Sequence, residues 1–209
     1  MKKAIITLAL VLSAGIMMAQ GLHFGPRAGF TVSNFIEKSS FGTTDTYSKP
    51  GFQLGATAEL EVLSFLYVGT TLSLYQKGYK NPIIEGVIVS KNTFTFLDLP
   101  IEIGYKMPIG NVSVYGQIGP YASVALAGKS RVVNHDEPDM NEDPYSLYEY
   151  ETYKRFDTGI SIAVGADYKQ YQVRINYTRG LTDFDEYDSY TTKTSSFGFS
   201  AAYFFGRNY

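Results

Sequence analysis

Few side chains in this chain have the chemistry that catalysis needs. Among its 209 residues the histidines are His23 and His135, and there is no cysteine. Nucleophilic and acid–base catalysis require a reactive group held beside a titratable partner, and no recognisable nucleophile motif surrounds either histidine. We therefore expect no catalytic residues and no cofactor.

Carboxylates and tyrosines gather in two segments. Residues 127–155 carry seven acids against four bases, and residues 182–193 carry four against one. Hard divalent cations take oxygen ligands, so four acids of the second segment are candidate metal ligands: Asp183, Asp185, Glu186 and Asp188. Their spacing lacks the glycine turn of a known calcium loop, and a solvated loop explains the same composition. Tyrosine also offers a large contact area, so these two segments are candidate sites for an extracellular ligand or protein.

The first residues have the pattern of an export signal. Lys2 and Lys3 precede an uncharged run from Ala4 to Ala19, which is typical of a secretory signal peptide. The run is shorter than the roughly 20 apolar residues of a membrane-spanning helix. We expect cleavage after Ala19, which leaves one domain at 20–209.

Charge and cysteine content exclude some classes of partner. Without Lys2 and Lys3 the formal charge changes from −2 to −4, so nucleic acid is not expected to bind. An exported chain without cysteine must be stabilised by burial and hydrogen bonding alone.

Alternation of apolar and polar residues predicts extended strands. In YQVRINYTRG (171–180), Tyr171, Val173 and Ile175 fall on one face and Gln172 and Arg174 on the other, because strand side chains point alternately to opposite sides. Eight segments alternate in this way: 22–33, 51–62, 66–77, 94–106, 112–126, 156–168, 171–181 and 194–205.

The connections between these segments alternate in length. Four long ones (34–50, 78–93, 127–155 and 182–193) are separated by three short ones (63–65, 108–111 and 169–170). In an up-and-down meander all long loops fall on one rim and all tight turns on the other, as in bacterial outer-membrane barrels. The sequence therefore predicts an all-β, eight-stranded, antiparallel transmembrane barrel with tight turns in the periplasm.

The two faces of the predicted strands differ in size and polarity. One carries large apolar residues such as Leu99, Ile101 and Ile162, and the other is rich in glycine, serine, threonine and charge. Since an eight-stranded barrel is just wide enough for side chains to fill it, we expect the polar face inside and the apolar face against lipid. The alternative is a soluble lipocalin-like barrel, which turns its apolar face inward around a ligand.

Several residues gain a specific role from this orientation. Five polar side chains at similar depth above the tight-turn rim are expected to form an interior network: Arg27, Glu59, Glu102, Gln117 and Arg174. Pro100 lacks an amide hydrogen, so we expect a bulge there. Six aromatic residues near strand ends are expected to form an interfacial girdle: Phe24, Tyr105, Tyr168, Tyr171, Tyr203 and Phe205.

Several motifs resemble those of one family. FGPRAGFTVSNF (24–35), FLDLPIEIGYKM (96–107), VYGQIGPYASVAL (114–126), FDTGISIAVGADY (156–168) and FGFSAAYFFG (197–206) resemble the PorT-like outer-membrane β-barrels of Bacteroidota. The resemblance covers residues 22–206. It implies an eight-stranded barrel in the outer membrane, for which the family's biochemical activities are largely unassigned.

These observations predict a monomer held in outer-membrane lipid, with a structural or interaction role through its acidic, tyrosine-rich extracellular loops. A narrow porin or transport-related channel is an alternative, although porins with an aqueous channel have about 16–18 strands. A barrel enzyme that acts on lipids is a third possibility.

Overall fold

Segments rich in valine, isoleucine, threonine and aromatic residues form strands throughout the chain, because such side chains suit a half-buried pleated surface. The computed structural model describes residues 21–39, 42–84, 88–134, 145–148, 153–184 and 191–207. The strands are β1 (Leu22–Ser39), β2 (Gly42–Asp45), β3 (Tyr47–Leu63), β4 (Leu66–Ile84), β5 (Ile88–Ile109), β6 (Val112–Asn134), β7 (Tyr145–Ser146), β8 (Phe156–Tyr168), β9 (Tyr171–Gly180) and β10 (Thr191–Tyr203). Among these residues there is no helix with the length and apolarity that a membrane crossing requires.

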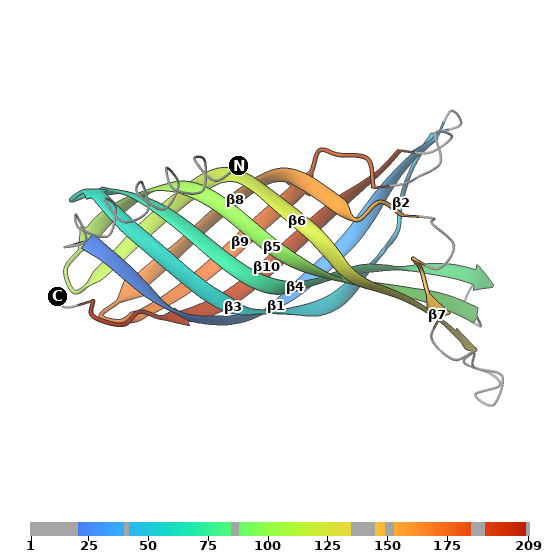
Figure 1. Ribbon diagram of the computed structural model, residues 1–209, viewed down its shortest axis with the longest axis horizontal. Coiled ribbons are helices and arrows are strands. Elements are labelled where there is room, and N and C mark those ends of the chain that lie inside the picture. Colours follow the sequence, from blue (N-terminus) through green and yellow to red (C-terminus); the bar gives the residue numbers. More distant parts are fainter. Residues whose placement is uncertain are drawn as a thin grey trace, which may run out of the picture.

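Eight of the strands close into an antiparallel barrel (Figure 1): β1, β3, β4, β5, β6, β8, β9 and β10. Each pairs with the next of these strands along the chain, and β10 returns to β1 over the register from Arg27–Ala202 to Lys38–Thr191. Closure leaves the barrel wall without an exposed edge. The short strands β2 and β7 extend the sheet beside β1 and β6. The predicted eight-stranded, up-and-down barrel is confirmed.

Several strands run further than alternation predicted, at what we call the long-loop end. β4 and β5 stay paired as far as Ile84–Ile88, and β5 and β6 as far as Ile88–Asn134. Much of the segments predicted as loops is therefore paired strand. Figure 1 shows these hairpins spreading beyond the barrel body, opposite the end that carries the tight turns. In these extensions apolar and polar residues no longer alternate regularly, so the sequence pattern fades although the backbone pairing continues.

The bulge expected at Pro100 is absent. The pairings Pro100–Tyr121 and Ile103–Ile118 share one register, and the register shift of this strand pair lies instead between Thr95 and Phe96. The Pro100 carbonyl oxygen accepts a hydrogen bond of 2.7 Å from the Thr70 hydroxyl. A proline removes a donor from the ladder without adding a residue, so the loss of one bond did not require a bulge.

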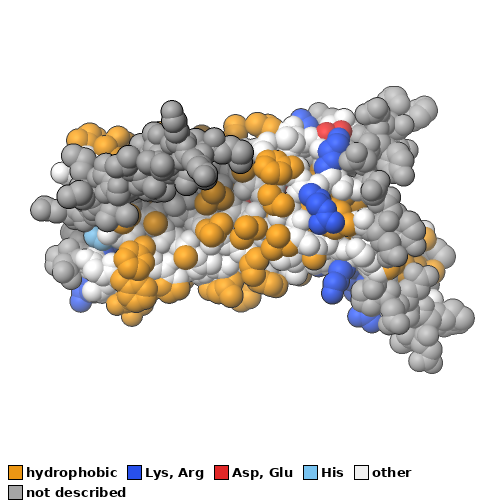
Figure 2. All heavy atoms as spheres, viewed as in Figure 1, with side chains coloured by type: hydrophobic (Ala, Val, Ile, Leu, Met, Phe, Trp, Pro, Cys, Tyr) orange, Lys and Arg blue, Asp and Glu red, His pale blue; other side chains and the backbone are white. Residues whose placement is uncertain are grey.

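The apolar face points outward and the polar face inward. Leu99, Ile101 and Ile162 are 40%, 54% and 46% exposed, whereas Arg27 and Glu102 are 2% and 0% exposed. Figure 2 shows hydrophobic side chains distributed over the visible outer surface of the barrel body. This arrangement is the reverse of a lipocalin-like barrel, so that alternative was wrong.

Glycines on the inward face make room for tyrosine rings. Tyr67 and Gly104 are cross-strand partners, and a Cβ atom on Gly104 would lie 2.2 Å from Cζ of Tyr67. Two further cross-strand pairs repeat this arrangement: Tyr115 with Gly165, and Tyr121 with Gly159. The small residues noticed in the sequence therefore let large polar rings fit into a narrow lumen.

Candidate functional site: the filled lumen and the cleft at the long-loop end

The charges buried inside the barrel balance. Among the described residues, five acids and five bases are buried: Glu59, Asp98, Glu102, Asp157 and Asp167, with Arg27, Lys77, Lys106, Arg174 and Arg207. Their formal charges sum to zero. Such balance is what a water-poor interior requires, because an unpaired buried charge is strongly unfavourable.

Nearest the tight turns, two carboxylates bind two cations. Lys106 Nζ lies 2.5 Å from Glu59 Oε2 and 2.8 Å from Asp167 Oδ2. Arg207 pairs with Glu59 and lies 3.1 Å from Asp167 Oδ2. The Gln172 amide donates to Glu59 at 2.7 Å and to Asp167 at 2.8 Å. Arg207 follows the last strand, so the chain folds back to fill this end of the barrel.

Three of the five predicted network residues meet at Glu102. Arg174 Nη2 lies 2.8 Å from Glu102 Oε1, and the Gln117 amide donates to the same carboxylate. The Ser161 hydroxyl adds a hydrogen bond of 2.7 Å to Glu102, and the Tyr67 hydroxyl donates to Gln117 at 2.6 Å. Glu102 is thus satisfied by one ion pair and two neutral donors.

The other two predicted residues, Arg27 and Glu59, are joined through Gln172. The Arg27 guanidinium donates to the side-chain carbonyl oxygen of Gln172, and to the Ser200 hydroxyl at 3.0 Å. The Gln172 amide then donates to Glu59. All five predicted residues are buried in the lumen, divided between these two groups.

A separate ion pair lies closer to the long-loop end. Lys77 Nζ lies 2.8 Å from Asp157 Oδ2, and neither side chain is more than 1% exposed. The hydroxyls of Tyr121 and Thr194 donate to the same oxygen at 3.1 and 2.8 Å. The Lys77 ammonium also lies 5.0 Å from the ring centroid of Phe96 and 4.6 Å from that of Tyr121, within the range of cation–π attraction.

Sequence reasoning did not assign the partners that complete these groups. Asp157 and Asp167 occupy inward positions of β8, and strand alternation could have identified them as network members. Lys77 and Lys106 lie at the last positions of their predicted strands, where the alternation pattern ends. Arg207 comes after β10, so no strand pattern places it in the lumen.

Apolar and aromatic side chains fill the barrel toward the long-loop end. The buried cluster consists of Phe35, Tyr79, Phe94, Phe96, Ala125, Leu147 and Phe184. Phe184 follows β9 and packs edge-on against Phe94, with ring centroids 5.2 Å apart. Leu147 follows β7. Segments outside the barrel strands therefore fold into its mouth above the polar layers.

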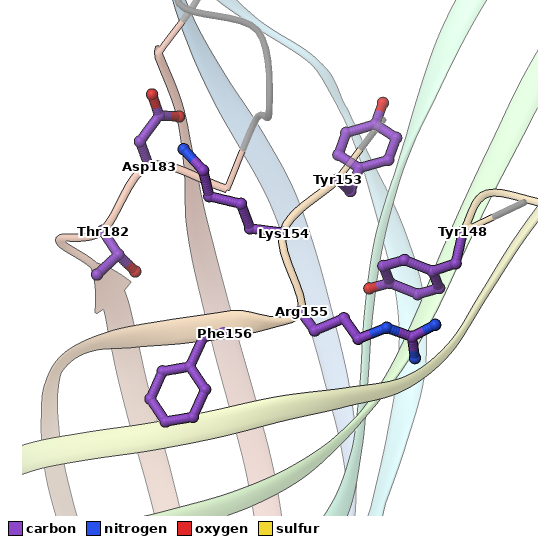
Figure 3. A pocket seen from close by; sticks show the side chains of 7 residues that line it. All are labelled: Tyr148, Tyr153, Lys154, Arg155, Phe156, Thr182 and Asp183. Atoms are coloured by element: carbon purple, nitrogen blue, oxygen red, sulfur yellow. The ribbon is translucent and has the colours of Figure 1, made fainter. Parts of the chain in front are cut away.

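An open cleft of about 730 Å³ lies beside this cluster (Figure 3), lined by Tyr148, Tyr153, Lys154, Arg155, Phe156, Thr182 and Asp183. Figure 3 shows Arg155 directed toward Tyr148 and Lys154 directed toward Asp183. The Arg155 guanidinium carbon lies 4.4 Å from the Tyr148 ring centroid. Burial raises the pKa of the Tyr148 phenol. The cleft offers aromatic surface, two cations and a carboxylate to a ligand.

Of the four candidate metal ligands, Asp183 is the one that lies among the described residues, where it lines the cleft. Its carboxylate accepts a hydrogen bond of 2.8 Å from the Thr192 amide. Asp185, Glu186 and Asp188 lie outside the described residues. Within the described part of the chain, no three histidine, cysteine, aspartate or glutamate residues are grouped so that they could hold a metal ion.

The two histidines lie apart from these groups. His23 Nε2 is 3.6 Å from Glu61 Oε1 near the tight-turn end. His135 lies outside the described residues.

The residues of the predicted aromatic girdle lie on the outward face at the tight-turn end. Four of them form a chain of rings: the centroids of Phe24 and Phe205 are 5.7 Å apart, those of Phe205 and Tyr203 are 5.3 Å apart, and those of Tyr203 and Tyr171 are 5.4 Å apart. Tyr105, with Phe65 as its ring neighbour, and Tyr168 are about half exposed.

The comparison with known families decides what kind of barrel this is. Residues 18–186 match the family described as "Outer membrane protein beta-barrel domain". The chain belongs to this family. An outer membrane protein of this kind meets lipid with the apolar face seen in Figure 2, and its lumen holds the charged groups described above.

Solved structures with a similar fold include outer-membrane barrels from several bacteria. The attachment invasion locus protein Ail of Yersinia pestis is 17% identical, with 88% of this chain and 99% of that chain covered and a TM-score of 0.43. Neisserial surface protein A is 12% identical, with 88% and 99% covered and a TM-score of 0.44. The outer membrane protease OmpT from Escherichia coli is 8% identical, with 89% and 97% covered and a TM-score of 0.35. A search of the curated proteins gave no match.

Proposed function

We propose that this outer membrane protein is a closed barrel that anchors a binding surface at its long-loop end. The observation that carries the proposal is the filled lumen. Ion pairs of Glu59, Glu102 and Asp157 occupy successive layers, and the aromatic cluster around Phe94 and Phe184 lies above them. A conducting channel needs a continuous path for water, so this arrangement favours a role at the surface over a porin role.

The chemistry of the long-loop end suggests the kind of partner. Segment 127–155 has seven acids and four bases, and segment 182–193 has four acids and one base. Together they carry a formal charge of −6. They also supply Tyr148 and Tyr153 to the cleft. The net negative charge of the two segments suits a basic peptide or protein with exposed lysine and arginine, because charge complementarity steers association, and their tyrosines offer contact area.

Three finer assignments belong to the same proposal. Residues 1–19 act as a signal peptide that directs export; they lie outside the described residues. The motifs at 96–107 and 114–126 support a PorT-like barrel within the wider family. The protein acts as a monomer in outer-membrane lipid, since closure between β1 and β10 leaves the barrel wall without a free strand edge for a second copy.

Conductance in planar lipid bilayers tests whether the lumen is closed. We expect no steady openings from the purified protein, with a trimeric porin as the positive control. Steady openings of uniform size would refute the closed barrel and would favour the narrow-porin alternative.

Binding to a peptide array tests the surface role. The protein in phosphatidylcholine nanodiscs is applied to synthetic peptides graded from acidic to basic. We expect binding to rise with positive peptide charge and to fall when Asp136, Glu137 and Asp139 are changed together to Asn, Gln and Asn. A matched change of Glu61→Gln at the opposite end should leave binding unchanged. Equal binding of acidic and basic peptides would contradict the proposal.

A further inference from the structure

Five positive side chains lie close together on the outer surface of β3 to β6 at the long-loop end. We call them the basic cluster: Lys49, Lys80, Lys91, Lys129 and Arg131. Figure 2 shows lysine and arginine side chains in a row where the hydrophobic surface of the barrel ends.

Strand register brings three of these cations side by side. Lys80 pairs directly with Lys91 across β4 and β5, and Lys91 pairs directly with Arg131 across β5 and β6. Lys129 pairs with Thr93, two residues from Lys91 on the same face of β5. Like charges directly opposite each other in a sheet destabilise it. The row is therefore unfavourable unless an anion lies against it.

Lys49 adds a fourth strand to the cluster. Its Cδ would lie 3.0 Å from a Cβ on Gly78, so the absence of a side chain on Gly78 lets the lysine lie across β4. Burial lowers the pKa of Lys49, and the positive charges of Lys80 and Lys91 lower it further. These three ammonium groups are thus close enough to repel one another.

The described residues provide no carboxylate partner for this cluster. Every ion pair among them involves other basic residues: His23, Lys77, Lys106, Arg174 and Arg207. The buried bases are neutralised inside the lumen, whereas the basic cluster faces outward with its charge uncompensated by that part of the chain.

The height of the cluster indicates where the anion comes from. On the barrel-body side of the cluster, the nearest exposed large apolar residues of β4, β5 and β6 are Leu74, Leu97 and Leu126, which are 40%, 39% and 51% exposed. The cations follow three to six residues beyond them along β4, β5 and β6. Lysine and arginine lay their apolar stems along such a surface and hold the charged end in the interface. The phosphates of membrane lipids lie at this boundary.

We propose that the basic cluster binds the phosphate groups of an anionic lipid in the outer leaflet. The repulsive row of Lys80, Lys91 and Arg131 is then stabilised by the ligand. A lipid fits better than a soluble anion, because its acyl chains can pack on the adjoining apolar face while its phosphates meet the cations. This site is independent of the proposed partner at the loops.

Native mass spectrometry of the full barrel in uncharged detergent tests the site. The probe is diphosphorylated lipid A, titrated against the wild type and four variants. Each basic residue near an anionic surface adds to the affinity for it, so Lys91→Gln should weaken lipid A binding about fivefold. The triple variant Lys80→Gln/Lys91→Gln/Arg131→Gln should weaken it roughly a hundredfold. Lys91→Arg should retain binding. Lys169→Gln removes the same charge from the exposed turn at the opposite end and should have no effect.

Two further ligands identify the source of the phosphate. Dephosphorylated lipid A, with the same acyl chains, should bind far more weakly than the diphosphorylated form. Inorganic phosphate should not displace diphosphorylated lipid A from the protein at concentrations that leave the barrel folded. Equal binding of the dephosphorylated lipid, full competition by inorganic phosphate, or an equal loss in Lys169→Gln would each overturn the proposal. Heat-modifiable gel mobility checks that each variant is folded. If the triple variant is not folded, Lys91→Gln alone takes its place.

Discussion

Replacing Lys77 by methionine tests whether the lumen excludes water. Lys77 and Asp157 form an ion pair of 2.8 Å in which neither side chain is more than 1% exposed. Methionine has a similar volume, so Lys77→Met removes the charge and leaves the Asp157 carboxylate with neutral donors: the Tyr121 and Thr194 hydroxyls on Oδ2, and the Thr182 hydroxyl at 3.4 Å from Oδ1. Breaking a buried pair from one side costs about 3–5 kcal/mol. This loss lowers the folding equilibrium constant by roughly a hundredfold to a few thousandfold.

A second substitution separates lost charge pairing from lost packing. Asp157→Asn, added to Lys77→Met, removes the stranded charge while an amide oxygen still accepts from the two hydroxyls. We expect the double variant to be more stable than Lys77→Met alone by about 2 kcal/mol or more. Lys169→Met, at an exposed turn position, should leave stability unchanged.

Equilibrium unfolding in urea within phosphatidylcholine vesicles measures these free energies. The chain has no tryptophan, so the folded fraction is followed by circular dichroism and by gel mobility without boiling. A loss of less than about 1 kcal/mol for Lys77→Met would mean that Asp157 is hydrated in the lumen. That result would refute the closed-barrel reasoning.

Three other substitutions test the orientation, the packing and the cleft. Ile101→Arg places a charge on the lipid face and should cost about 2–4 kcal/mol in the same urea assay. Gly104→Val displaces the Tyr67 ring and should cost about 1–3 kcal/mol; an unchanged urea midpoint would contradict the packing described for this pair. Because burial raises the pKa of Tyr148, its phenol should ionise at higher pH than an ordinary tyrosine, as seen in phenolate difference absorbance against Tyr148→Phe. The unfolded phenol loses its proton first as pH rises, so Tyr148 should lower stability above the ordinary tyrosine pKa, and Tyr148→Phe should remove that decrease.

Much of the barrel was predictable because its signals are local. Alternation in YQVRINYTRG reflects a property of neighbouring residues and identifies β9 almost to its ends. The tight turns at 64–65, 110–111 and 169–170 follow from short connections between such segments. The bulge at Pro100 was wrong, since the sequence shows the missing donor but not how the two neighbouring strands adjust around it.

The network was predictable only in part. Depth along each strand placed Glu102, Gln117 and Arg174 at one level, and in the structure both other side chains contact the Glu102 carboxylate from inward positions of barrel strands. Depth could not show that Arg27 reaches Glu59 through Gln172, since that link depends on the inclination of the strands and on side-chain reach across the lumen.

The sequence by itself determined the number of barrel strands, their order and the face that meets lipid, because these depend on a period of two residues and on connection length. Only the tertiary structure decided which charges pair, that Arg207 returns into the lumen, that Phe184 fills its mouth, and that Lys80, Lys91 and Arg131 stand in one row. The physical reason is that these contacts join residues far apart in the chain. They follow from strand register and from the folding of segments beyond the strands, neither of which leaves a periodic pattern in the sequence.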